Sequence, residues 1–178
     1  MARPIELIPL LCLNCATRLP ANPDEAAWVC PQCGEGQRLD EREGLARLEV
    51  HYSSGIPLNQ PGKPYWVVDG QARFQRKTYS GSQSAEAEKF WGDSRRFFIP
   101  AYTLPLETLL KVGSAFVSHP PTLEAGPPAP FEAVTLSLED VTAIAQFIAM
   151  AIEADRPDKL KELQVNLQLG DPVLWILP

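Results

Sequence analysis

The alternation of apolar and polar residues along this 178-residue chain predicts a series of short β-strands. They occupy residues 26–29, 45–52, 64–68, 71–79, 95–101, 163–169 and 173–177. Asp69-Gly70 separates two runs of aromatic and β-branched residues, and therefore predicts the turn of a β-hairpin. Aromatic residues recur in residues 64–68, 96–100 and 173–178, which we expect to be strands of one sheet with the aromatic side chains on its packed face.

Helix-forming Ala, Glu and Lys predict a short helix over residues 82–91. Apolar residues three and four positions apart predict two more helices, over residues 104–117 and 138–154. Thr103 is the expected N-cap of the second helix. Ser137 is the expected N-cap of the third, with Asp140 three residues later. The third helix has a broad apolar face, so we expect it to lie against a sheet. Strands and helices in this order predict an α+β domain with a mixed or antiparallel sheet.

Prolines mark two further segments. Pro4 and Pro9 predict an extended lead-in over residues 1–11, because proline removes an amide donor and restricts its neighbour. Residues 118–130, which we call the proline-rich strap, predict a stiff polyproline-like crossing. The strap is either a linker or a segment laid over a surface.

Composition and charge narrow the classes of protein. The content of 45% hydrophobic and 21% charged residues is that of a globular protein. A formal net charge of −6 disfavours nucleic acid as the main partner, because phosphate binding needs clustered Lys and Arg. The most apolar run, residues 141–154, is shorter than the roughly 20 residues that a membrane-spanning helix requires. The apolar N-terminal run is interrupted by Glu6 and Pro9 and lacks a small-residue cleavage site, so we expect a cytoplasmic protein without a membrane span.

All four cysteines lie in two Cys-x-x-Cys pairs with fourteen residues between them: Cys12, Cys15, Cys30 and Cys33. Two thiolates at one tight turn can face the same ion, and two such turns complete a tetrahedron. In a reducing compartment this spacing favours a metal over disulfides. Four sulfur ligands leave no open position, so we expect one structural Zn²⁺. Gly34, after the last cysteine, permits the positive φ that such a turn needs, whereas Ala16 stands at the equivalent place in the first pair.

The first Cys-x-x-Cys, a strand containing Trp28, and then Cys30-Pro31-Gln32-Cys33-Gly34 together resemble a zinc ribbon over residues 10–40. The second half also resembles a rubredoxin knuckle, which would hold redox-active iron. The first pair lacks the glycine of that knuckle and the spacer is shorter than rubredoxins use, so zinc is favoured. Zinc ribbons occur in transcription factors, ribosomal proteins and enzyme appendages. The resemblance therefore implies a bound metal but does not specify a function. The predicted domains are a zinc ribbon over residues 1–44 and an α+β domain over residues 45–178.

Other candidate chemistry is sparse. His51 and His119 are the only histidines and neither lies in a catalytic motif, so we assign no catalytic residue and expect no enzyme activity. Five basic residues with aromatic neighbours Phe74 and Tyr79 could gather as a patch for RNA or single-stranded DNA. They are Arg73, Arg76, Lys77, Arg95 and Arg96. In an acidic protein, the favoured interpretation of such residues is a solvated face.

These observations predict a non-enzymatic zinc-ribbon adaptor or accessory subunit that mediates protein–protein contacts in a larger assembly. The alternative is a nucleic-acid-associated zinc-ribbon factor of transcription or translation. We expect the proline-rich strap and the C-terminal strand to lie near the partner, because a stiff segment loses little entropy on docking. The strap would have the same composition if it only covered its own sheet.

Overall fold

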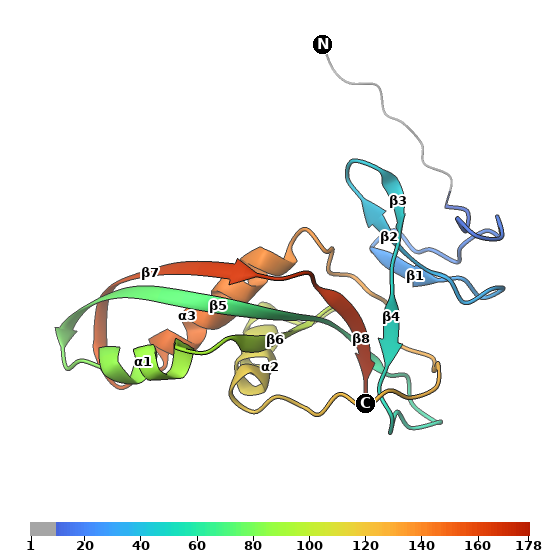
Figure 1. Cartoon of the computed structure of the whole chain (residues 1–178). Coiled ribbons are helices and arrows are strands. Elements are labelled where there is room, and N and C mark those ends of the chain that lie inside the picture. Colours follow the sequence, from blue (N-terminus) through green and yellow to red (C-terminus); the bar gives the residue numbers. More distant parts are fainter. Residues whose placement is uncertain (1–9) are drawn as a thin grey trace, which may run out of the picture.

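The computed structural model describes residues 10–178 and contains two β-sheets and three helices (Figure 1). This arrangement confirms the predicted α+β fold. The predicted extended lead-in, residues 1–11, lies outside the described residues except for its last two positions. Among the described helices, none combines the length and the apolar character needed to cross a membrane.

The smaller sheet contains three antiparallel strands in the order β1-β2-β3. They are β1 (Ala27–Val29), β2 (Gly36–Asp40) and β3 (Gly44–Arg47). The turn between β2 and β3 is closed by the amides of Arg42 and Glu43, which donate to Asp40 Oδ1 at 2.9 and 3.0 Å. These two bonds, with the Arg38 side chain, lower the pKa of Asp40 to about 2.

The predicted strand over residues 45–52 is wrong, because the chain divides it between the two sheets. Its first part is β3, whereas β4 (Val50–Tyr52) pairs in parallel with the last strand of the larger sheet. Between β3 and β4, the Leu48 amide donates to the Gly36 carbonyl at 2.8 Å. A Cβ at position 36 would collide with the Leu48 carbonyl oxygen, so this junction requires glycine. The smaller sheet therefore extends past residue 44, and independent folding of the two predicted domains stays a prediction.

The larger sheet has the strand order β4-β8-β5-β6, and β7 also pairs with β5. Its strands after β4 are β5 (Lys63–Ser80), β6 (Arg95–Pro100), β7 (Lys159–Leu169) and β8 (Val173–Leu177). β5 is antiparallel to β6, β7 and β8. All three aromatic-rich runs are therefore strands of one sheet, as predicted.

The predicted hairpin turn at Asp69-Gly70 is wrong, because β5 continues through both residues as one strand of 18 residues. Gly70 pairs with Arg95 of β6 on one edge and with Leu169 of β7 on the other. The Asp69 side chain is held by Arg96 across the strand pair, at 2.7 Å from its Nε. Strands from distant parts of the chain thus supply the partners that a local hairpin would have supplied.

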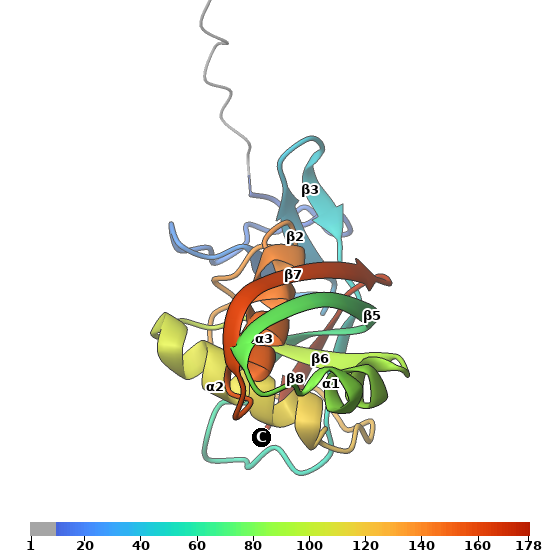
Figure 2. The same cartoon turned by 90° about the vertical axis from the view of Figure 1, so that its left-hand side faces the viewer.

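Beyond Gly70, β5 and β7 form a two-stranded arm that curves past the other strands, with α3 lying beneath it (Figure 2). In this arm β5 pairs with β7 along one edge only, and no other strand in residues 10–178 pairs with residues 71–80.

The helices lie close to their predicted positions, but two predicted caps are wrong. They are α1 (Ser84–Trp91), α2 (Leu106–Ser118) and α3 (Val141–Ala154). α3 begins later than predicted because the Ser137 hydroxyl donates to the Asp140 carboxylate at 2.9 Å instead of capping a backbone amide. The residue at the N-cap of α2 is Pro105, because the Thr103 hydroxyl lies 3.3 Å from that of Thr135.

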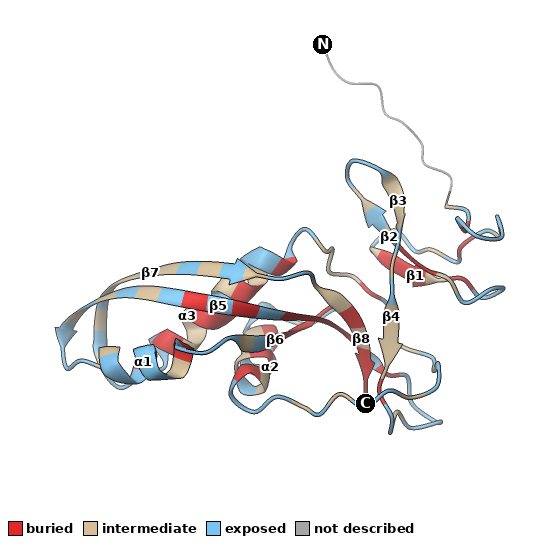
Figure 3. Ribbon diagram, in the orientation of Figure 1, coloured by how far each residue is buried: buried red, intermediate tan, exposed pale blue. Residues whose placement is uncertain are grey.

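The larger sheet is buried on both faces at residues 64–68 of β5 and 97–100 of β6 (Figure 3). On one face Trp66, Phe97 and Ile99 belong to the same core cluster as Ile148 of α3. On the other face Tyr65 and Phe98 pack with Phe116 of α2 and with Leu123 of the strap. This two-sided packing explains why the strand sequences contain nearly continuous apolar runs.

The proline-rich strap is hydrogen-bonded to its own domain. The Gly126 amide donates to the Tyr52 carbonyl at 2.7 Å, and the Ser54 amide donates to the backbone carbonyl of Glu124 at 2.7 Å. A Cβ on Gly126 would lie 2.7 Å from the Ser53 carbonyl oxygen, so the two backbones are in direct contact. These contacts fit the second interpretation of the strap, in which it covers its own sheet.

Candidate metal centre

The four cysteines converge at one end of the smaller sheet, and all four sulfur atoms lie within 4.8 Å of one another. Cys12 Sγ lies 3.5 Å from Cys33 Sγ, and Cys15 Sγ lies 3.6 Å from Cys30 Sγ. No disulfide joins them. A tetrahedron with metal–sulfur bonds of about 2.3 Å places its sulfurs about 3.8 Å apart. The donor set and its spacing therefore fit a tetrahedrally coordinated metal ion.

Each Cys-x-x-Cys pair is held in the same backbone turn. The carbonyl of Cys12 accepts from the Ala16 amide, and that of Cys30 accepts from the Gly34 amide, both at 2.9 Å. The amide of the first cysteine of each pair donates to the carbonyl five residues later, at 2.8 and 2.9 Å. Gly34 has φ +76° and Ala16 has φ +59°, so the first turn adopts the left-handed conformation without the glycine that favours it.

We expect Ala16→Gly to stabilise the metal-binding segment by about 0.5–1 kcal/mol. The left-handed conformation costs an L-residue roughly 1–2 kcal/mol, of which the greater entropy of glycine in the unfolded chain offsets a part. Competition with a chelator should show tighter metal binding, since binding is linked to folding of this segment. Ala21→Gly, at a negative φ in the same segment, is the control and should give no gain. Equal effects of both substitutions would contradict the expectation.

The thiols of the cluster have different electrostatic surroundings. Burial raises the pKa of Cys30 to about 11. The Thr17 hydroxyl, 3.3 Å from Cys15 Sγ, lowers the pKa of Cys15 to about 6. Burial would raise the pKa of Cys12, but the amides of Cys15 and Asn14 lower it overall. A cation among the sulfurs would favour the thiolate even of the buried Cys30, so metal binding would release protons.

Few other side chains support the cluster. Cys12 and Cys30 are buried beside Leu19 and Trp28, and the indole Nε1 of Trp28 donates to Glu25 at 2.8 Å. A core this small gives little stability by itself, which is the usual situation of a metal-dependent module.

Gln37 is a supporting residue that the sequence did not reveal. It is fully buried, and its Oε1 accepts from the Leu13 amide at 2.8 Å. This bond ties β2 to the first cysteine turn. Gln37 stands in a polar run of the sequence, and its role depends on the contact between two distant segments.

Among the described residues, neither histidine belongs to a group of three or more side chains that could hold a metal. The His51 ring stacks on Trp175 with centroids 4.9 Å apart, and its Nε2 lies 3.2 Å from the exposed Glu49. His119 is exposed at the end of α2, where its amide donates to the Ala115 carbonyl.

Four of the five basic residues of the predicted patch are bound to acceptors of the same chain. Arg96 pairs with Asp69, Lys77 pairs with Glu162, and Arg95 Nε donates to the Phe90 carbonyl at 2.7 Å. The Arg76 side chain is buried against Glu153 and Asp158. Because these four side chains are bound within the chain or buried, they do not support a basic surface that binds nucleic acid.

Comparison of this chain with protein-family models, with curated proteins and with solved structures found no match in any of the three. The function is therefore inferred from the geometry of the chain itself.

Proposed function

We propose that Cys12, Cys15, Cys30 and Cys33 hold one structural Zn²⁺ in a zinc ribbon, and that the chain is a non-enzymatic adaptor or accessory subunit that binds protein partners in the cytoplasm. The main support for this proposal is that the four sulfur atoms lie within 4.8 Å of one another. Four thiolates would leave no coordination position for a substrate, so the ion would stabilise the fold without taking part in a reaction.

Exposed apolar side chains support a role in protein contacts. Leu11 and Leu13, which flank Cys12, are 43% and 47% exposed. On α3, Phe147 and Met150 are one turn apart and are 50% and 38% exposed. Neighbouring exposed apolar side chains are candidate contacts for another protein. The nucleic-acid alternative lacks comparable support, because most of the predicted basic residues are already paired and the net charge is −6.

Native purification of the full chain, with elemental analysis and identification of co-purifying proteins, tests the proposal. We expect about one zinc per chain and a reproducible partner, which chemical cross-linking should join directly to this protein. The same preparation stripped with a chelator is the control for bound metal. Absence of zinc, or iron in its place, would contradict the metal assignment. Purification without any partner, or with nucleic acid that dissociates steeply with salt, would contradict the adaptor.

A further inference from the structure

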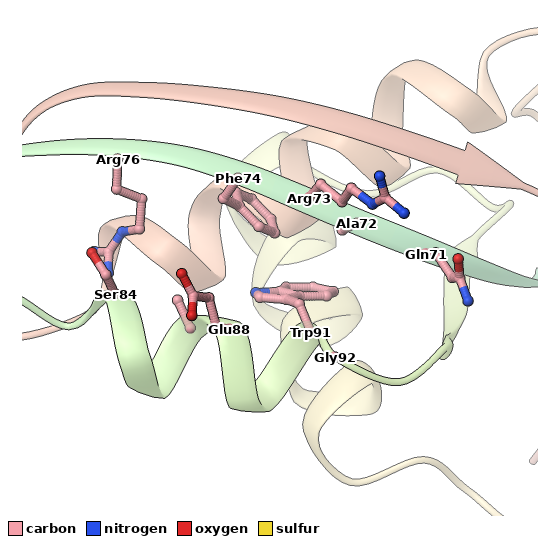
Figure 4. Close-up of a pocket in the computed structure, with 10 residues that line it drawn as sticks. Gln71, Ala72, Arg73, Phe74, Arg76, Ser84, Glu88, Trp91 and Gly92 are labelled. Carbon is pink, nitrogen blue, oxygen red and sulfur yellow. The ribbon is translucent and has the colours of Figure 1, made fainter.

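A cavity of about 590 Å³ lies between the outer half of β5 and helix α1 (Figure 4). Four consecutive residues of β5, residues 71–74, line it. Successive side chains of a strand point to opposite faces, so a cavity that contacts all four must reach the edge of the strand itself. On the α1 side, Trp91 faces Phe74, with ring centroids 5.1 Å apart.

This edge of β5 is unpaired in the described part of the chain. β6 ends its pairing where Arg95 meets Gly70, and Ser94 Oγ donates to the Gly70 carbonyl at 3.1 Å. Beyond that point residues 71–80 pair with β7 on the opposite edge, and no other backbone hydrogen bond joins them to residues 10–178. An unpaired strand edge beside a cavity can accept an additional strand.

Arg76 adds an unpartnered donor to the same cavity. Its side chain is 2% exposed; Nη2 donates to Asp158 at 2.8 Å and Nε lies 3.2 Å from Glu153 Oε2. Nη1 is buried without a hydrogen-bond partner. Buried polar atoms are nearly always hydrogen-bonded, so this donor is open to an acceptor from outside the described chain, either water or a ligand group.

The charges of the cavity favour an acidic ligand. Two arginines, Arg73 and Arg76, line it with Glu88; the charge of Arg76 is compensated by Glu153 and Asp158, so the exposed Arg73 is the cation that a ligand would meet. Arg73 makes no ion pair with any described residue. A strand that paired here would lie beside the Arg73 cation, the unpartnered Nη1 of Arg76 and the aromatic pair on β5 and α1.

We propose that an extended acidic segment of a protein partner adds as a strand to the free edge of β5 at residues 71–77. A carboxylate of the segment accepts from Arg76 Nη1, and an apolar side chain contacts Phe74 and Trp91. A small-molecule ligand would account for the cavity and for Arg76 but would leave the backbone edge unpaired. This proposal rests on the adaptor function and names its contact surface.

Selection from a library of displayed ten-residue random peptides against the full, zinc-loaded chain tests the proposal. We expect selected peptides to be rich in Asp and Glu. Bound peptide should slow amide hydrogen exchange in residues 71–77, because strand addition gives the free amides new acceptors. A synthetic copy of a selected peptide then gives the dissociation constant by fluorescence anisotropy.

Two substitutions in the cavity should weaken this binding. Arg73→Glu places a negative charge beside the acidic peptide and should raise the dissociation constant about tenfold or more. Ser84→Trp fills the cavity from α1 and should abolish binding, while circular dichroism checks that the fold is kept. Lys89→Glu, an exposed charge reversal on the same helix outside the cavity, is the matched control and should change binding little.

The proposal is overturned if no peptide is selected, if protection falls on other residues, or if Arg73→Glu binds as tightly as Lys89→Glu. Binding of free glutamate at these residues without amide protection would show a small-molecule site and would also overturn strand addition. If a native partner binds the Ser84→Trp chain unchanged, this surface is wrong while the adaptor function stands. If peptides bind as expected but native purification yields no partner, the adaptor function fails alone.

Discussion

Cys30→Ser is expected to remove the bound metal and to unfold the smaller sheet, while the larger sheet stays folded. Structural zinc contributes about 10–16 kcal/mol of apparent binding free energy in small modules, far more than the few buried side chains around Trp28 can replace. All four ligands lie before β2, so the larger sheet loses no ligand. Zinc content and residue-resolved amide exchange measure the two effects. Gln32→Ala, at an exposed position between two ligands, is the matched control and should keep the metal.

Simultaneous loss of both sheets would show that they share one core. The structure offers two routes for such coupling. The Ala26 amide donates to the Val134 carbonyl at 2.8 Å, and Ala27 is buried in the core cluster of the larger sheet. Gly36 and Leu48 form the second junction. Unfolding of the whole chain by Cys30→Ser would therefore contradict the division into two independently folding domains.

Glu153→Ala is expected to lower the free energy of unfolding by about 3–5 kcal/mol, the usual cost of leaving one member of a buried ion pair alone. Glu153 is fully buried at the end of α3. Its Oε1 accepts from Trp91 Nε1 and from Arg156 Nε, each at 2.8 Å, and its Oε2 lies 3.2 Å from Arg76 Nε. One substitution thus removes the acceptor of two hydrogen bonds and the carboxylate that lies beside Arg76 Nε, under the outer half of the β5–β7 arm. Denaturant-induced unfolding measures the effect.

Glu162→Ala is the matched control, because Glu162 pairs with Lys77 on the same arm but in solvent. Exposed ion pairs contribute about 0–1 kcal/mol, so this variant should be close to the parent in stability. A loss from Glu153→Ala no larger than that from Glu162→Ala would mean that the buried network adds nothing to stability.

The sequence alone was sufficient to predict the features that depend on residues close together in the chain. The Cys-x-x-Cys spacing identified the four sulfurs that converge, because each pair sits in one tight turn. Helix-forming residues located α1, and the apolar periodicity located α2, each within about two residues. The apolar runs of β6 and β8 were equally informative, because strands buried on both faces have short, nearly continuous apolar sequences.

The sequence was insufficient where a distant segment changed a local preference. Asp69-Gly70 favours a hairpin turn, but β6 and β7 supply partners to both edges of β5 and keep it extended. The run 45–52 favours one strand, but its two ends pair in different sheets. In both cases the tertiary contacts outweigh a propensity of about 1 kcal/mol or less.

Only the tertiary structure determined the proposed peptide site, which is the cavity beside the free edge of β5. Arg76, Glu153 and Asp158 come from β5, α3 and the turn that follows it, and in the sequence each is an ordinary charged residue. Local spacing cannot show that these charges are buried together, or that β6 ends and leaves an edge of β5 free. Chain neighbours determine the metal ligands, whereas strand pairing between distant segments determines the arm, its buried network and its open edge.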